Sequence, residues 1–205
     1  MFGSLSGMTP DVADDGRDQH IAEACRQPSE AVNAALNWCC RAPYPPPTHM
    51  SIRNLDSLFD PRSVAVIGAS ERPHSVGNTV WRNMQQSDFT GPVWPVNPKY
   101  RELSGHACYA SVEDLPEPPE MAIICTPAAT VVPLVKQLAG LGTRAAVVIS
   151  AGLSAQQKQA MLDAARPALL RILGPNCVGL LAPHKGLNAS FAHVPARPGQ
   201  LAFVS

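Results

Sequence analysis

The feature that most constrains this chain is a series of short apolar segments, each ending at a turn signal and followed by a longer segment of helical character. The apolar segments are rich in Val, Ile and Ala, which is typical of strands buried on both faces of a parallel sheet. We therefore expect strands at residues 63–67, 93–96, 121–125, 145–149 and 171–173.

Helices are expected between these strands, at residues 76–86, 129–141 and 155–165. Gly142 marks the end of the second helix and Pro167 stops the third. Strands that alternate with helices form right-handed βαβ units. The predicted fold class is therefore α/β, a Rossmann-like doubly wound parallel sheet with helices on both faces. Pro95 removes an N–H group from the second strand, which suggests an edge position or an irregularity.

Composition excludes several classes of function. Hydrophobic residues make up 45% of the chain and charged residues 16%, with a formal net charge of zero. A neutral chain has no overall field that would attract nucleic acid or an acidic membrane. No apolar run reaches the roughly 20 residues of a membrane span, and residues 1–10 lack the pattern of a secretory signal. The six cysteines form no C-x-x-C pair, so we expect reduced thiols and a cytoplasmic location.

The N-terminal residues differ from the rest of the chain. Residues 42–47 are a stiff, proline-rich spacer, and residues 30–38 have weak helical character. We predict that residues 1–49 are a mostly disordered or weakly helical extension without chemistry. Met50 stands just ahead of the predicted domain in the context of a natural start, which makes residues 1–49 a candidate start-site artefact.

The loop after the first strand, residues 68–77, is the first candidate binding element. Ligands of parallel sheets bind at the carboxyl ends of the strands. This loop begins and ends with glycine before a helix, and a helix N-terminus favours an anionic phosphate. Ser70 and Ser75 add hydroxyl groups. The match to G-x-G-x-x-G is poor, because no glycine lies two residues after Gly68, so a glycine turn without a ligand is the alternative.

The loop after the second strand, Asn97-Pro98-Lys99, distinguishes between nucleotide ligands. NAD sites usually place an acidic residue at this position to bind the ribose hydroxyl groups. Lys99 favours a phosphate instead, such as the ribose phosphate of CoA or of NADP. The alternative is a solvated lysine in a turn.

The loop after the fifth strand, Gly174-Pro175-Asn176-Cys177, is the most unusual string in the chain. Asn176 can organise neighbouring loops through hydrogen bonds. Cys177 is a possible nucleophile, but no base can be placed beside it, so we interpret it mainly as an inert, buried thiol. The chain has no cluster of ligands with zinc spacing, and no metal is proposed.

Four of these strings together carry a resemblance to a known family. Residues 66–70, 95–99, 147–152 and 173–177 resemble the CoA-binding domain of ADP-forming acetyl-CoA synthetases, which are NDP-forming acyl-CoA synthetases. They are similar, more distantly, to the alpha subunit of succinyl-CoA synthetase. Residues 186–191, followed by residues 201–205, resemble most the long bacterial versions that are joined to a GNAT-type protein lysine acetyltransferase domain.

This resemblance implies CoA or acyl-CoA as the ligand and assigns a role to residues in each loop. They are Gly68, Ala69 and Ser70 at the CoA phosphates; Asn97, Pro98 and Lys99 at the nucleotide end; Thr126 and Pro127 beside the pantetheine path; Ser150, Ala151 and Gly152 at the thiol end; and Asn176 and Cys177 facing the place where an acyl phosphate meets CoA.

The resemblance also implies a division of labour between domains. Residues 50–180 would form the CoA-binding domain, and residues 181–205 a linker and the first strand of a truncated second domain. The family's phosphohistidine and ATP-grasp domain would lie outside this chain, so we expect it to bind CoA without turnover and to depend on a partner chain for the flavodoxin-like and ATP-grasp domains. The alternatives are a CoA-responsive regulatory or scaffold module and an NADP-dependent oxidoreductase domain.

Overall fold

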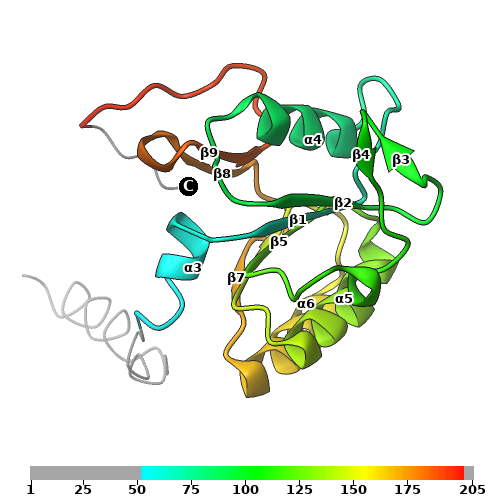
Figure 1. The fold of residues 1–205 in the computed structure, drawn as a ribbon. Helices are drawn as coiled ribbons and strands as arrows, with labels where there is room; N and C mark the ends of the chain where they lie inside the picture. The colour runs from blue at the N-terminus through cyan, green and yellow to red at the C-terminus, as the bar shows by residue number, and fades with distance from the viewer. Residues whose placement is uncertain (1–51, 201–205) are drawn as a thin grey trace, which may run out of the picture. The chain divides into compact units, whose positions relative to one another are not determined.

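The computed structural model describes residues 52–200, which form a parallel sheet covered on both faces (Figure 1). The sheet has five strands in the order β2-β1-β5-β6-β7. The direction in which strands are added reverses between β1 and β5, as in doubly wound folds. The predicted fold class is thus confirmed. The strands are β1 (Val64–Ile67), β2 (Val93–Val96), β5 (Met121–Ile124), β6 (Ala145–Val148) and β7 (Arg171–Leu173).

Three helices cover the sheet, one on one face and two on the other (Figure 1). In β1, Val64 and Val66 belong to the same core cluster as residues of α4, whereas Ala65 and Ile67 belong to the cluster that contains residues of α5 and α6. Successive side chains of a strand point to opposite faces, so one apolar strand serves both cores. The helices are α4 (Val76–Gln86), α5 (Ala128–Leu141) and α6 (Ala155–Ala165).

The ends of these helices follow from local hydrogen bonding. Ser75 caps α4 by accepting a hydrogen bond from the Asn78 N–H at 3.2 Å. Ser154 and Gln157 form a capping box at the start of α6, which satisfies two backbone donors at once. Gly142 ends α5 with φ of 87°, a conformation that glycine adopts without steric cost. The expected end of the second helix is therefore confirmed.

A hairpin completes the face of the sheet that α4 covers only in part. Its strands are β8 (Gly179–Ala182) and β9 (Leu187–Ser190), joined by η3 (Pro183–Lys185). Leu187 and Ala189 are fully buried in the cluster that also contains Trp81 of α4. The hairpin differs from the sequence prediction, which assigns residues 181–205 to a linker and the first strand of a second domain. Residues 201–205, which we expect to hold the first strand of the second domain, and the extension predicted at 1–49 lie outside the described residues.

Pro95 fits into β2 without loss of a bond to β1. The Val96 carbonyl accepts a hydrogen bond from Gly68 N–H at 2.8 Å, whereas the Pro95 carbonyl accepts from Tyr109 N–H at 3.0 Å. The nitrogen and carbonyl of one residue in a parallel strand point to the same side, so the Pro95 nitrogen faces away from β1. The predicted edge position is confirmed.

Shorter elements connect these layers. They are α3 (Asp56–Phe59), β3 (Glu102–Leu103), β4 (His106–Ala107), η1 (Val112–Asp114) and η2 (Arg166–Ala168).

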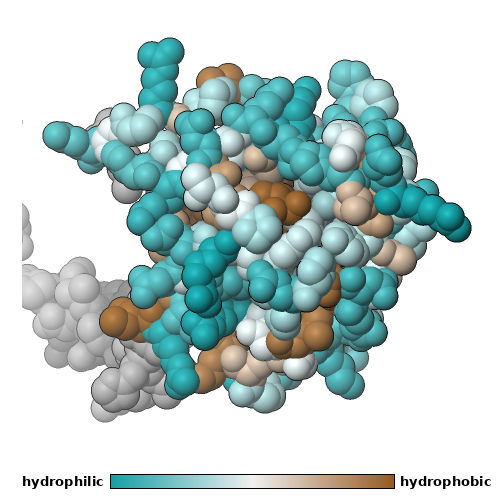
Figure 2. Space-filling model, in the orientation of Figure 1, coloured by the Kyte–Doolittle hydropathy of each residue, from teal (hydrophilic) through white to brown (hydrophobic). Residues whose placement is uncertain are grey.

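The face drawn in Figure 2 is mostly hydrophilic, with scattered apolar side chains between polar ones. Among the helices of residues 52–200, none combines the length and the hydropathy that a membrane-spanning helix requires.

Glu120 joins several segments just before β5, where the strands begin. Its carboxylate accepts hydrogen bonds from Arg62 N–H at 2.8 Å, from Arg62 Nε at 3.1 Å and from Ser57 Oγ at 3.0 Å. Arg144 Nη1 lies 3.7 Å from the same carboxylate. Burial by itself raises the pKa of Glu120, but the bonds from Arg62 and Ser57 outweigh it and lower the pKa below its usual value.

We predict that Glu120 makes the fold sensitive to acid. A lowered folded-state pKa contributes stability above the unfolded-state pKa of about 4.3, and this contribution is lost as the pH falls through the folded-state value. Glu120→Gln should lower the free energy of unfolding at pH 7 by about 1–3 kcal/mol and flatten its decline between neutral pH and acid. Urea unfolding at several pH values measures both effects. The exposed Glu117→Gln is the control, and equal pH profiles for the two variants would contradict the prediction.

We further predict that Gly77 tolerates no side chain. A Cβ atom at this position would lie 1.9 Å from the Gly68 carbonyl oxygen, so Gly77→Ala should destabilise the fold by about 1–3 kcal/mol or more. Gly140→Ala is the matched control in α5, where a Cβ would meet nothing within 4 Å, and it should stabilise by about 0.5–1 kcal/mol. Denaturant unfolding followed by circular dichroism compares them; a neutral Gly77→Ala would refute the close contact.

Candidate functional site

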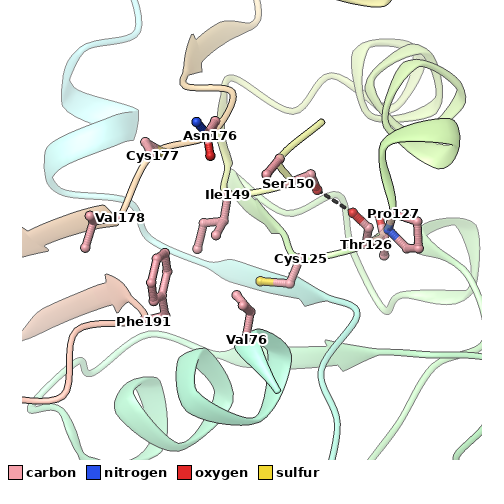
Figure 3. A pocket seen from close by; sticks show the side chains of 11 residues that line it. Val76, Cys125, Thr126, Pro127, Ile149, Ser150, Asn176, Cys177, Val178 and Phe191 are labelled. Atoms are coloured by element: carbon pink, nitrogen blue, oxygen red, sulfur yellow. Dashed lines mark hydrogen bonds between the residues drawn. The ribbon is translucent and has the colours of Figure 1, made fainter. Parts of the chain in front are cut away.

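A cavity of about 490 Å³ opens at the carboxyl ends of β5, β6 and β7, next to the start of α4. Cavities of this size commonly hold small ligands or parts of cofactors. The side chains around it come from separate segments of the chain (Figure 3). Its lining residues are Val76, Cys125, Thr126, Pro127, Ile149, Ser150, Ala151, Asn176, Cys177, Val178 and Phe191.

The loops after β5 and β6 are tied together on one side of this cavity. Ser150 Oγ donates to the Thr126 carbonyl at 2.5 Å and lies 3.4 Å from the Ile124 carbonyl (Figure 3). Ser150 is buried, and its bond to Thr126 is partly shielded from water. Ala151 also lines the cavity, whereas Gly152, the third predicted residue of this loop, is exposed and is not among the lining residues.

The loop after β7 joins the same group. Asn176 N–H donates to the Ser150 carbonyl at 3.1 Å, and Cys177 Sγ lies 3.5 Å from the Val148 carbonyl. Gly174 has φ of +97°, and a Cβ there would lie 2.3 Å from the Val148 carbonyl oxygen. The loop can therefore lie directly on β6 only with glycine at this position. The structure thus brings three of the predicted loops around one cavity.

The predicted phosphate loop after β1 is ordered by hydrogen bonds of its own. Ser70 Oγ accepts from Arg72 N–H at 3.0 Å and lies 3.3 Å from Tyr100 Oη. Asn78 Nδ2 of α4 donates to the Ser70 carbonyl at 3.0 Å. Gly68 has φ of +89°, and its missing Cβ would lie 3.0 Å from Thr126 Cγ2. This loop therefore meets the cavity group at Thr126.

The predicted loop after β2 is linked to the phosphate loop rather than to the cavity. Asn97 Nδ2 donates to the Ala69 carbonyl at 2.7 Å, and Asn97 Oδ1 accepts from Lys99 N–H at 3.0 Å. Pro98 and Lys99 are exposed. Asn97 thus fixes the backbone that carries Lys99 beside the phosphate loop and leaves the lysine side chain open to solvent.

Comparison with known proteins covers the same loops. Residues 62–183 match the CoA-binding domain family. This chain belongs to the CoA-binding domain family. It is 39% identical to acetate–CoA ligase (ADP-forming) I of Archaeoglobus fulgidus over 74% of this chain and 23% of that protein. It is 36% identical to the alpha subunit of acetate–CoA ligase (ADP-forming) II of Pyrococcus furiosus, over 74% of this chain and 34% of that subunit.

Solved structures agree with these relatives. The dinucleotide-forming acetyl-coenzyme A synthetase 1 of Ca. Korarchaeum cryptofilum, in complex with phosphate and ADP, superposes with a TM-score of 0.63 at 36% identity, over 67% of this chain and 30% of that chain. The protein PH0766 of Pyrococcus horikoshii gives 0.65 at 36% identity, over 68% and 33%. The resemblance to ADP-forming synthetases is therefore confirmed, and this CoA-binding domain spans about a third or less of these relatives. The link to acetyltransferases stays a prediction.

Several lining residues of this CoA-binding domain were not foreseen from the sequence. Val76, Val178 and Phe191 line the cavity from the start of α4 and from the two sides of the hairpin (Figure 3). The sequence does carry a signal for the hairpin. The apolar run 178–182 and the alternating apolar and polar residues 187–191 flank a turn that ends at Gly186, a pattern that favours a hairpin. Within residues 52–200, no group of three or more His, Cys, Asp or Glu side chains is placed to hold a metal ion.

The two cysteines of the cavity are held in their thiol form. Burial, together with a smaller effect of the nearby Cys177, raises the pKa of Cys125 to about 12. Burial also raises the pKa of Cys177, although hydrogen bonds from the backbone of Gly179 and of Cys177 itself act against it. Because the thiolate is the nucleophilic form, neither side chain is activated for attack.

We predict that both thiols resist alkylation in the folded chain. With a pKa of about 12, roughly one Cys125 in a thousand is a thiolate at pH 9. Iodoacetamide at pH 7.5 and pH 9 should therefore leave Cys125 unmodified and modify Cys177 far more slowly than a free cysteine. Peptide mass mapping reads out each site, and the chain unfolded in urea is the control. Rapid labelling of the folded chain at pH 7.5 would contradict the prediction.

Proposed function

We propose that this chain is the CoA-binding module of an NDP-forming acyl-CoA synthetase-like protein. The observation that carries the proposal is the position of the cavity. It lies at the carboxyl ends of the strands, and all but one of its lining residues fall inside the segment that matches the CoA-binding family. Doubly wound sheets bind their ligands at this edge.

In this proposal, CoA extends from the phosphate loop into the cavity. Its diphosphate meets the backbone of Gly68, Ala69 and Ser70 near the N-terminus of α4, which favours anions. Its ribose phosphate meets Lys99, whose backbone Asn97 ties to the phosphate loop. The pantetheine arm enters the cavity, where Thr126, Ser150 and Asn176 supply polar groups to its amides.

The same geometry supports binding without turnover. None of the residues that line the cavity is charged, and its two thiols are protonated at neutral pH. The cavity therefore offers no group to carry a phosphoryl group or to activate an acid. We propose that flavodoxin-like and ATP-grasp domains, from the rest of a longer protein or from a partner chain, supply these groups, and that the assembly works in the cytoplasm.

The first test is a calorimetric titration of the full chain with CoA, with NADPH as the comparison ligand. We expect saturable heat with CoA and none with NADPH. Heat from NADPH alone would favour the oxidoreductase alternative. A folded sample that gives no heat with CoA would overturn the proposal.

The role of Lys99 gives a sharper prediction. CoA should bind more tightly than dephospho-CoA, because only CoA carries the ribose 3′-phosphate. An exposed cation contributes modestly, so Lys99→Ala should weaken CoA binding by about threefold to tenfold and leave dephospho-CoA binding unchanged. Lys136→Ala, an exposed lysine of α5, is the matched control. Equal affinity of the unchanged chain for the two ligands would remove the phosphate role of Lys99.

A further inference from the structure

Phe191 occupies a distinctive place in the cavity wall. It directly follows β9, and its ring lies between Val76 and Val178 (Figure 3). It is partly buried and packs against the core cluster that contains α4 and the hairpin. Apolar side chains thus form one side of the cavity, opposite the polar groups of Thr126 and Ser150.

The backbone around Phe191 is held from two directions. Its N–H donates to the Val178 carbonyl at 3.1 Å. Asn83 Nδ2 of α4 donates to the carbonyl of Ser190 at 2.8 Å and to that of Ala192 at 2.9 Å. Asn83 is 8% exposed. Its bond to Ser190 is buried, and its bond to Ala192 is partly buried. The Asn83 side-chain amide therefore holds the residues before and after Phe191 in place. This constraint fixes the direction of the Phe191 side chain.

The two sides of the cavity match the two kinds of group in a pantetheine arm. Its amides require polar partners, whereas its methylene and methyl groups gain from apolar contact. We propose that Phe191 binds the pantetheine arm of CoA and that Asn83 is a positioning residue that aims Phe191 into the cavity. This inference rests on the proposed function and adds an element that binds the end of the ligand opposite to Lys99.

The test compares CoA with two smaller ligands, each of which corresponds to one end of the CoA molecule. Calorimetry of the full chain uses CoA, 4′-phosphopantetheine and adenosine 3′,5′-bisphosphate. Loss of a half-buried aromatic contact in Phe191→Ala should weaken CoA and phosphopantetheine binding by about tenfold and leave adenosine bisphosphate binding unchanged. Lys99→Ala should give the reverse pattern. Phe59→Ala, at an exposed phenylalanine of α3, is the matched control and should change none of the three affinities.

A second pair of variants separates positioning from folding. Asn83→Ala should weaken the same two ligands as Phe191→Ala, and the double variant should bind no more weakly than Phe191→Ala alone, because both substitutions remove one interaction. Circular dichroism establishes that each variant is folded. If Phe191→Ala does not fold, Phe191→Leu carries the test, with about threefold weaker binding of the same two ligands.

The outcomes are distinct. An unchanged CoA affinity in the folded Phe191 variants would overturn the inference, as would an equal loss for adenosine bisphosphate, which would indicate a general structural role. Additive effects of Asn83→Ala and Phe191→Ala would overturn the positioning role. If the unchanged chain binds no CoA, the proposed function itself fails, and the inference fails with it.

Discussion

The contact between Gly77 and the Gly68 carbonyl is the constraint on which the rest of the site depends. A side chain at Gly77 would lie 1.9 Å from that oxygen, so glycine alone lets α4 begin directly over the end of β1. From that start, α4 brings Val76 to the cavity and Asn83 to the hairpin. The absence of a Cβ at Gly77 therefore affects both the phosphate loop and the apolar side of the cavity, which Val76, Val178 and Phe191 form.

The loops at this edge are held chiefly by hydrogen bonds between polar side chains and backbone carbonyls. Asn97 ties the loop after β2 to the phosphate loop, Ser150 ties the loops after β5 and β6, and Asn83 ties α4 to the hairpin. Each bond links segments that are distant in sequence. Backbone groups that are held in this way present a fixed surface to a ligand, which reduces the conformational entropy lost on binding.

The two ends of the sheet differ in the charge of the side chains that they carry. At the amino end, the ionised Glu120 joins Arg62 and Ser57 and contributes to stability. At the carboxyl end, the cavity is lined by uncharged side chains and by thiols that stay protonated. Such a cavity suits the binding of a neutral arm and offers no group for phosphoryl transfer. This difference is consistent with the proposed module, in which the cavity binds part of CoA and other domains supply the chemistry.

The five strands of the main sheet, the three helices that cover it and the loops after the strands could be predicted from the sequence, because apolar periodicity and turn residues are local signals. Resemblance in four spaced strings then indicated the family. Three placements follow from the tertiary fold alone: β8 and β9 fold back on α4, Phe191 faces the cavity, and Gly152 lies outside it. These placements depend on bonds such as that from Asn83 to Ser190, which join residues 107 positions apart. No local pattern encodes such a pairing, because its partners lie far apart in the chain and are brought together only by the tertiary fold.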